Sequence, residues 1–369
     1  MPQYAEQHFV PKFYLRNFSS EGRQLNLVNI GSEKVILGAS LRKQCARTKF
    51  YDFDPDTEFD LGRLEAKTAP IIRQIMASDQ FLRPDVEYEK YVNLVLFVVV
   101  QHVRGVRTAN ANDEMTDYYG KLMLQSRAEA QGIDLTKVKI GNKYPAALPL
   151  LSIPDIMPSA MTLRPHLIVN RSARDFVTSD DPVVLHNQYC EGIDYQGVLG
   201  WRSKGIQVFF PLSPRHLLVL FDNSIYRMGS RRSHLATEIT SSAEVEQFNS
   251  MQVLHAVANI YFKQSVDADQ SRELVRKLVK DRPKRAMTIV ETEIVDKPDG
   301  TGSSLVHTFQ PLLRCRLSVS AIRYQSGVSK MRLHDRGRMI GRPKEFWDKQ
   351  SGGTRYEIAK TIGAYDEID

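Results

Sequence analysis

The stretch IQVFFPLSPRHLLVLFD, residues 206–222, decides how this chain is expected to fold. Two runs rich in Val, Leu and Phe lie on either side of the turn-forming residues Ser213 to Arg215. Such residues favour β-strands, and turn residues bound them. HLIVN (166–170) and DFVTSDDPVVLHN (175–187) have the same character. We therefore expect the three stretches to be strands of one sheet.

Helical periodicity occurs on both sides of these strands. From Asp60 onward, apolar residues recur at helical spacing, and Asp60 is a suitable N-cap. The residue pattern predicts four further helices, with Gly132 ending the second of them. They cover residues 86–108, 113–131, 242–262 and 269–281.

The remaining segments complete a mixed fold. Residues 4–18, interrupted by Pro11, are expected to form an extended or loop entry. Alternating residues predict a hairpin over 24–40. Three late strands are expected in AMTIVETEIV, SLVHTF and RLSVSAIRY, with PDGTGSS as a turn. This order predicts an α+β fold, with a helical N-terminal half packed on a mainly antiparallel mixed sheet and a small C-terminal β extension.

The same pattern predicts the domain organisation. Residues 1–282 are expected to form one α+β domain, residues 283–325 the β extension, and residues 326–369 a basic, Gly-rich tail. The composition, 42% hydrophobic and 25% charged, is that of a globular protein. The apolar runs are too short for a membrane helix, and the first residues lack a signal peptide's apolar stretch. We therefore expect no membrane partner and a cytoplasmic protein. The sequence does not indicate an oligomeric state.

The charge is unevenly distributed. Residues 270–349 contain 18 basic and 9 acidic residues, whereas the rest of the chain has a net charge of −2. A basic stretch can follow a nucleic-acid backbone, because each neutralised phosphate releases counterions. The alternative is a solvated tail whose charge aids solubility. Nucleic acid or a nucleotide is therefore a candidate partner.

The helix expected over residues 86–108 combines an apolar circumference with a polar stripe that includes Gln101 and Arg104, and Arg107 lies close to this stripe. A buried guanidinium must be paired. One interpretation is a single buried ion pair that fixes the core, for which Glu65 can be the partner. The other is an anion-binding wall at a cleft.

Two carboxylates, Asp180 and Asp181, follow a strand rich in β-branched residues. Adjacent carboxylates can hold a divalent metal such as Mg²⁺ or act as acid and base. Neighbouring side chains on a strand point to opposite faces, so at most one of them is expected to face any given site. The alternative is a turn or cap before Pro182. Asn249 lies on a polar face of the helix expected over 242–262, where solvation is the ordinary interpretation.

Familiar catalytic signatures are absent from the sequence. The nine histidines form no HExxH or HxH pair, and Cys45, Cys190 and Cys315 lack zinc-site spacing. The sequence also has no GxSxG elbow and no Walker-type phosphate loop. These patterns therefore assign no reaction and no metal.

Several separated phrases nevertheless occur in a recognisable order. They are QHFVPKFYLRNF, KFYDF, LEAKTAPIIRQI, QHVRGVRT, DFVTSDDPVVL, FFPLSPRHLLVL and FNSMQ. In this order the chain resembles the bacterial domain-of-unknown-function 4238 family over about residues 7–265. The resemblance implies shared positions and no mechanism, because the family has no assigned activity. The family-like polar positions are His8, Glu65, Arg104 or Arg107, Asp180 and Asn249.

Two hypotheses follow. The leading one is an enzyme acting on a phosphate-containing substrate, a nuclease or nucleotide hydrolase, for which a place in phage defence would fit. His8, Glu65 and Asp180 would be its catalytic residues, with Asp180 and Glu65 as metal ligands or general base and His8 as general acid. The substrate-binding residues would be Gln101, Arg104, Arg107 and Asn249. The alternative is a non-catalytic module that binds nucleic acid or protein, in which a buried Arg–carboxylate network is structural.

Overall fold

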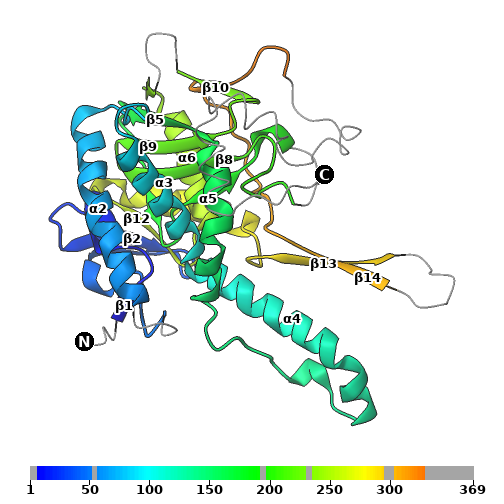
Figure 1. The fold of residues 1–369 in the computed structure, drawn as a ribbon. Helices are drawn as coiled ribbons and strands as arrows, with labels where there is room; N and C mark the ends of the chain where they lie inside the picture. Colours follow the sequence, from blue (N-terminus) through cyan, green and yellow to red (C-terminus); the bar gives the residue numbers. More distant parts are fainter. Residues whose placement is uncertain (1–5, 52–55, 192–196, 230–234, 295–302, 329–369) are drawn as a thin grey trace.

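The structure, a computed structural model, describes residues 6–51, 56–191, 197–229, 235–294 and 303–328. Within these ranges, helices and strands form two main sheets with helices packed on them (Figure 1). In chain order the elements are β1 (Glu6–His8), α1 (Lys12–Leu15), β2 (Gln24–Asn29), β3 (Lys34–Ser40), β4 (Ala46–Thr48), α2 (Thr57–Ser78), α3 (Tyr88–Val103), α4 (Val106–Ala130), α5 (Ile153–Met161), β5 (Arg164–Asn170), β6 (Thr178–Ser179), β7 (Val184–His186), β8 (Gln207–Ser213), β9 (His216–Phe221), β10 (Tyr226–Met228), β11 (Ala236–Ile239), α6 (Ser242–His255), β12 (Asn259–Phe262), α7 (Ala268–Leu278), β13 (Thr288–Ile294), β14 (Ser303–Phe309) and β15 (Ile322–Tyr324).

The larger sheet has five strands in the order β11-β5-β9-β8-β7. Its four strands from β5 to β7 are antiparallel to their neighbours, and β11 runs parallel to β5. The predicted α+β class is confirmed, with several mostly antiparallel sheets. The N-terminal half is not purely helical, since it also contains β1 to β4.

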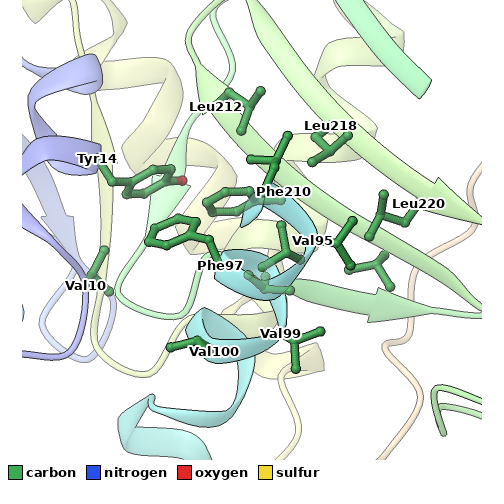
Figure 2. Packing of buried hydrophobic residues seen from close by; sticks show 14 of the residues in the cluster. Val10, Tyr14, Val95, Phe97, Val99, Val100, Phe210, Leu212, Leu218 and Leu220 are labelled. Carbon is green, nitrogen blue, oxygen red and sulfur yellow. The ribbon is translucent and has the colours of Figure 1, made fainter. Parts of the chain in front are cut away.

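Both faces of this sheet are buried. In β9, Leu218 and Leu220 pack toward α3, whereas Val219 and Phe221 pack toward α6 on the other side. Figure 2 shows the first face, where side chains of α3 lie against those of β8 and β9. Because side chains alternate along a strand, burial on both faces requires an apolar residue at nearly every position. This explains the continuous apolar run in residues 206–222.

The second sheet has the order β3-β2-β12-β6, and α7 covers one of its faces. This corrects the expectation that DFVTSDDPVVLHN belongs entirely to one sheet, because β6 joins the second sheet while β7 joins the first. Asp180 and Asp181 therefore lie where the chain crosses from one sheet to the other. The predicted hairpin is confirmed as β2 and β3.

The prediction of one helix over residues 86–108 is wrong in its length. It is broken at Arg104–Gly105, where Gly105 has an extended backbone with φ −76° and ψ 165°. Asp181 lies against this break, and its Oδ1 is 3.3 Å from the position that a Cβ of Gly105 would occupy. After the break, α4 continues to Ala130. Gly132, at φ +67°, follows its end as expected.

The helix expected over residues 242–262 is also shorter than predicted. It ends at His255, and Ala256 is extended with φ −52° and ψ 150°. The next three backbone N–H groups, which a continuing helix would bond internally, are donated to Asp180 instead. The chain then forms β12.

Two smaller corrections concern the N-terminal part. The segment expected as loop contains β1 and the short helix α1, which Pro11 precedes at the N-cap with φ −66°. Helix α2 starts at Thr57, so that Asp56 is at the N-cap and Asp60 lies within the first turn. Aspartate still lies near the positive end of the helix dipole in both cases.

The late strands do not form one unit. β13 and β14 make a two-stranded sheet of their own, while β15 pairs with β10 beside the larger sheet. The expected turn at 298–304 lies largely outside the described residues, as does nearly all of the expected tail. The domain division stays a prediction. In Figure 1, α4 and the β13–β14 hairpin extend away from the sheets and the helices around them. No helix in the described part of the chain is long and apolar enough to cross a membrane.

Candidate functional site

Arg104, at the end of α3, is the centre of the first polar network. Its Nη1 donates to Glu65 Oε1 at 2.9 Å, while Nε and Nη2 both donate to Gln101 Oε1 at 3.0 and 2.8 Å. The residue is only 1% exposed. The buried side of the guanidinium is therefore occupied by two partners from the fold itself.

This network joins four segments of the chain. Glu65 comes from α2, and Gln101 donates its Nε2 to the carbonyl of Phe9, after β1, at 2.9 Å. The Tyr51 hydroxyl donates to the Arg104 carbonyl at 2.8 Å. A buried charge is tolerated only with such complete pairing, and removal of one partner is expensive. The expected pairing of Arg104 with Glu65 is observed, and this ion pair joins α2 to the end of α3.

A less buried group of charges borders this network. His8 is half-buried, its Nε2 lies 3.0 Å from the Arg42 carbonyl, and burial followed by the charge of Lys12 lowers the pKa of His8. On α2, burial and then the neighbouring Glu65 raise the pKa of Glu58. Its Oε2 is buried and has no hydrogen-bond partner among the described residues.

Asp180 belongs to a second network, at the turn between α6 and β12. Its Oδ1 accepts the N–H of Val257 at 2.8 Å, and its Oδ2 accepts those of Ala258 and Asn259 at 2.8 and 3.1 Å. Burial raises the pKa of Asp180 to about 6, although the three donors act in the opposite direction. The carboxylate fixes the backbone of the turn that follows α6.

Asp181 points into a different part of the same region. Its Oδ2 accepts from Arg107 Nε at 2.8 Å and lies 3.4 Å from His255 Nδ1. Arg107 also donates to the His255 carbonyl, near the end of α6. Burial raises the pKa of Asp181, which Arg107 opposes, and burial lowers the pKa of His255 to about 3. Together with Asp180, this ion pair holds the end of α6 from both sides, at its carbonyl groups and at the N–H groups beyond them.

Asn249 lies in a third contact, on the buried face of α6. Its Nδ2 donates to the Asp175 carbonyl and its Oδ1 accepts the N–H of Val177, both at 2.9 Å. Asn249 is 1% exposed, so it is not the solvated surface residue of the ordinary interpretation. Its neighbour on the helix, Gln252, similarly donates to the Pro182 carbonyl at 2.9 Å.

The seven candidate residues are thus divided among three sets of contacts. Glu65, Gln101 and Arg104 meet, with His8 bordering them. Arg107 and Asp180 both hold the end of α6, and Asn249 fixes the backbone before β6. The first two sets adjoin at the α3–α4 break. Three surface grooves, of about 800, 840 and 470 Å³, are lined by other residues.

The structure also tests the suggestion of a metal. Among the residues it describes, no group of three or more His, Cys, Asp or Glu side chains is arranged to hold a metal ion. Both carboxylate oxygens of Asp180 accept hydrogen bonds from backbone N–H groups, and Oδ2 of Asp181 accepts a hydrogen bond from Arg107. The carboxylates of this pair face different partners, as alternation along an extended chain predicts.

Sequence reasoning missed the roles of Asp181, His255 and Glu58. Asp181 carries the ion pair to Arg107, which its position beside Asp180 could have suggested. The contacts of His255 could not be predicted because the helical pattern of the sequence continues past the true end of α6. Glu58 was missed because the helix was expected to start only at Asp60.

Comparison with known proteins gives one match. A family model described as "Protein of unknown function (DUF4238)" matches residues 6–265. No curated protein and no solved structure matches the chain. The matched range contains all seven candidate residues.

Proposed function

We propose that this chain, which belongs to the DUF4238 family, is a non-catalytic module that binds nucleic acid through its basic C-terminal part. One observation carries the proposal: all seven candidate residues make hydrogen bonds within the fold, and four of them, Gln101, Arg104, Asp180 and Asn249, are at most 5% exposed. Arg104 is the strongest case, being 1% exposed with Glu65 and Gln101 as partners. A phosphate could reach it only by displacing them.

Exposed positive charge supports the choice of partner. From α7 to the start of β13, Arg272, Lys277, Lys280, Lys284 and Arg285 are exposed. Acidic residues in this segment are fewer, and the following sequence up to residue 349 adds further basic residues. Such a surface binds phosphate backbones by counterion release without requiring a pocket.

The test is binding of labelled DNA and RNA over a range of salt concentrations. The variant Lys277→Glu/Lys280→Glu/Lys284→Glu should bind at least about tenfold more weakly, and its dependence of log affinity on log salt should be shallower by about 3. Charge reversals at three exposed lysines on other elements, Lys34, Lys43 and Lys67, form the matched control and should have a smaller effect. Equal losses in both variants, or no binding by the wild type, would refute the proposal.

A second candidate is the enzyme acting on a phosphate-containing substrate. It is favoured by Glu58, whose buried Oε2 has no hydrogen-bond partner among the described residues and whose carboxyl pKa is raised. A carboxyl with a raised pKa close to Glu65 and Arg104 is a group that acid–base chemistry could use. In this hypothesis Asp180 and Glu65 are ligands or general base, His8 is the general acid, and Arg104 neutralises phosphate.

Turnover distinguishes the two candidates. The protein is incubated with DNA, RNA and nucleotides, with and without Mg²⁺ or Mn²⁺. His8→Gln is the sharpest variant, because His8 is only half-buried and its removal should leave the fold intact. Turnover that His8→Gln abolishes would establish the enzyme. Binding without turnover would establish the module.

A further inference from the structure

Strands β10 and β15 place two arginines directly opposite each other. In their antiparallel register Arg227 is the partner of Arg323, and both residues are exposed. Their neighbours along the strands, Tyr226, Met228 and Ile322, are buried in the core beside the larger sheet. Because directly opposite residues of a strand pair lie on the same face, the two guanidinium groups share the outer face of β10 and β15.

The fold does not compensate these two charges within the described ranges. Neither Arg227 nor Arg323 takes part there in an ion pair or a side-chain hydrogen bond. Like charges directly opposite each other on antiparallel strands destabilise the pair, and a two-stranded sheet is only marginally stable by itself. An anion bound between the two arginines would remove this repulsion.

The two arginines line a groove of about 840 Å³. The end of α2 and the edge strand β11 supply other lining residues, including Asp79 and Glu238. Val169 contributes an apolar part of the lining. Pockets that hold small molecules have volumes of this size, and a phosphate or carboxylate group alone would fill only a part of it.

Both carboxylates in this groove already have partners. Arg171 Nη2 lies 2.7 Å from Asp79 Oδ2 and 2.9 Å from Glu238 Oε1. Asp79 Oδ1 also lies 2.6 Å from His216 Nε2. The hydrogen bonds from His216 and Arg171 lower the pKa of Asp79, so this carboxylate is held in its charged, paired form. Arg227 and Arg323 are therefore the charges in the groove that the described residues leave unmatched.

We propose that Arg227 and Arg323 bind the phosphate group of a small phosphate monoester, whose remaining part lies in the groove toward β11. A phosphate monoester carries a charge of about −1.5 to −2 at pH 7, which matches two guanidinium groups. Each guanidinium presents a planar fork of N–H donors that can pair with two phosphate oxygens. A carboxylate has a single charge and two oxygens, so one arginine would satisfy it.

The polar character of the opposite side of the groove indicates the rest of the ligand. Asp79, Gln80 and Glu238 offer oxygen acceptors there. Hydroxyl groups can donate to such acceptors, whereas a second phosphate would be repelled by the carboxylates. The ligand class that fits both sides is therefore a hydroxyl-bearing phosphate monoester, such as a sugar phosphate.

The proposed site also joins two parts of the chain. Arg227 lies within residues 6–265, which the family model matches, whereas Arg323 lies beyond them. The two arginines come together only when β15 pairs with β10. A ligand that binds this paired form should stabilise it by mass action.

Isothermal titration calorimetry of the full-length protein with ribose 5-phosphate, in a phosphate-free buffer, tests the proposal. Arg227→Gln/Arg323→Gln should bind at least about tenfold more weakly than the wild type. The matched control, Arg23→Gln/Arg73→Gln, removes the same charge from two exposed arginines that line none of the three grooves. It should bind as the wild type does. No binding by the wild type, or equal losses in both variants, would overturn the proposal.

Thermal unfolding without ligand shows whether the loss of binding is a loss of folding. Since Arg227→Gln/Arg323→Gln removes a repulsion, its unfolding temperature should equal or exceed that of the wild type. Ribose 5-phosphate should raise the unfolding temperature of the wild type and leave that of the variant unchanged. A variant that is clearly destabilised would mean that the two arginines have a structural role, which would overturn the proposal.

Two further comparisons test the geometry and the ligand. Arg227→Lys/Arg323→Lys keeps both charges but loses the planar forks, so it should bind several-fold more weakly, and unchanged affinity would overturn the pairing with guanidinium groups. Ribose, which has no phosphate, and dimethyl phosphate, a diester with one charge, should bind at least about tenfold more weakly than ribose 5-phosphate. A diester that binds equally well would overturn the preference for a monoester. These assays contain no nucleic acid, so their outcome is independent of the proposed function.

Discussion

Helices α3 and α4 meet at Gly105, but they differ in the exposure of their long side chains to solvent. At the end of α3, the charged Arg104 is 1% exposed, and the fold supplies its partners. On the outer half of α4, the apolar Met123 is 85% exposed. Charge inside the protein has to be satisfied by fixed partners, whereas apolar surface outside it remains available to another molecule. The comparison separates buried polar residues, which hold the fold together, from apolar side chains of α4 that are open to solvent.

The largest expected effect is on the buried side of this comparison. Arg104→Met removes the guanidinium and leaves Glu65 and Gln101 facing a buried apolar side chain. Breaking a buried pair by removing one partner costs about 3–5 kcal/mol. Urea unfolding of the variant should show a loss of this size in the free energy of unfolding.

The matched variant is Arg104→Met/Glu65→Gln, in which no unpaired charge is left. It should recover part of the stability lost in Arg104→Met, since the remaining amides can bond to each other or to water. If Arg104→Met is as stable as the wild type, the buried ion pair of Arg104 does not stabilise the fold, and the contrast with α4 is lost.

A smaller loss is expected at the turn after α6. Asp180→Asn keeps the side-chain size but replaces one acceptor oxygen by an NH₂ group, which would face a backbone N–H such as that of Val257. The lost hydrogen bond and the unsatisfied donors should cost about 1–3 kcal/mol. The measurement is again urea unfolding. Asp181→Asn, which instead weakens the ion pair to Arg107, should also destabilise, so that two independent losses are observed. No change in either variant would contradict the structural role of these carboxylates.

The pH dependence should be the most gradual effect, because it is spread over more than two pH units. Burial lowers the pKa of His102, at the end of α3, from 6.5 to about 4. Between these values the unfolded chain binds a proton that the folded chain does not, so stability rises with pH from 4 to 6.5 and is lost as the pH falls. At about 1.4 kcal/mol per pKa unit, the contribution is at most about 3.5 kcal/mol.

Unfolding of wild type and His102→Gln at several pH values between 4 and 7 measures this contribution. The difference in unfolding free energy between the two proteins should grow in favour of the wild type as the pH rises to 6.5 and then become constant. The carboxyl of Asp180, whose pKa of about 6 is raised, has the opposite dependence and is common to both proteins. A difference independent of pH would show that His102 is not held neutral by burial.

The fold class could be predicted because burial leaves a strong pattern in the sequence. Residues 206–222 are apolar at nearly every position since both faces of β8 and β9 are covered, and that pattern needs no knowledge of the partners. The pairing of Arg104 with Glu65 could be suggested for a similar reason, because a charge within an apolar helix demands a partner. These inferences depend on local sequence alone.

The breaks and the contacts of the site could not be predicted in this way. Helical periodicity continues across Gly105 and across Ala256. The helices nevertheless end there, where Asp181 contacts Gly105 and Asp180 accepts hydrogen bonds from the backbone after Ala256. Backbone N–H groups, which are the partners of Asp180, have no sequence signature. The sequence therefore predicts one catalytic site for polar residues that belong to separate sets of contacts in the structure. The exposure of apolar residues on α4, such as Met123, could not be predicted either, because apolar residues at helical spacing are usually buried.

The most direct measurement compares wild type with Arg104→Met/Glu65→Gln in two assays run side by side, nucleic-acid affinity and metal-dependent turnover of DNA, RNA and nucleotides. A cooperative unfolding transition first establishes that the double variant is folded. If the interior charges are structural, neither protein shows turnover with Mg²⁺ or Mn²⁺, and both bind nucleic acid with the same salt-dependent affinity. Turnover by the wild type that the folded double variant lacks would contradict this account.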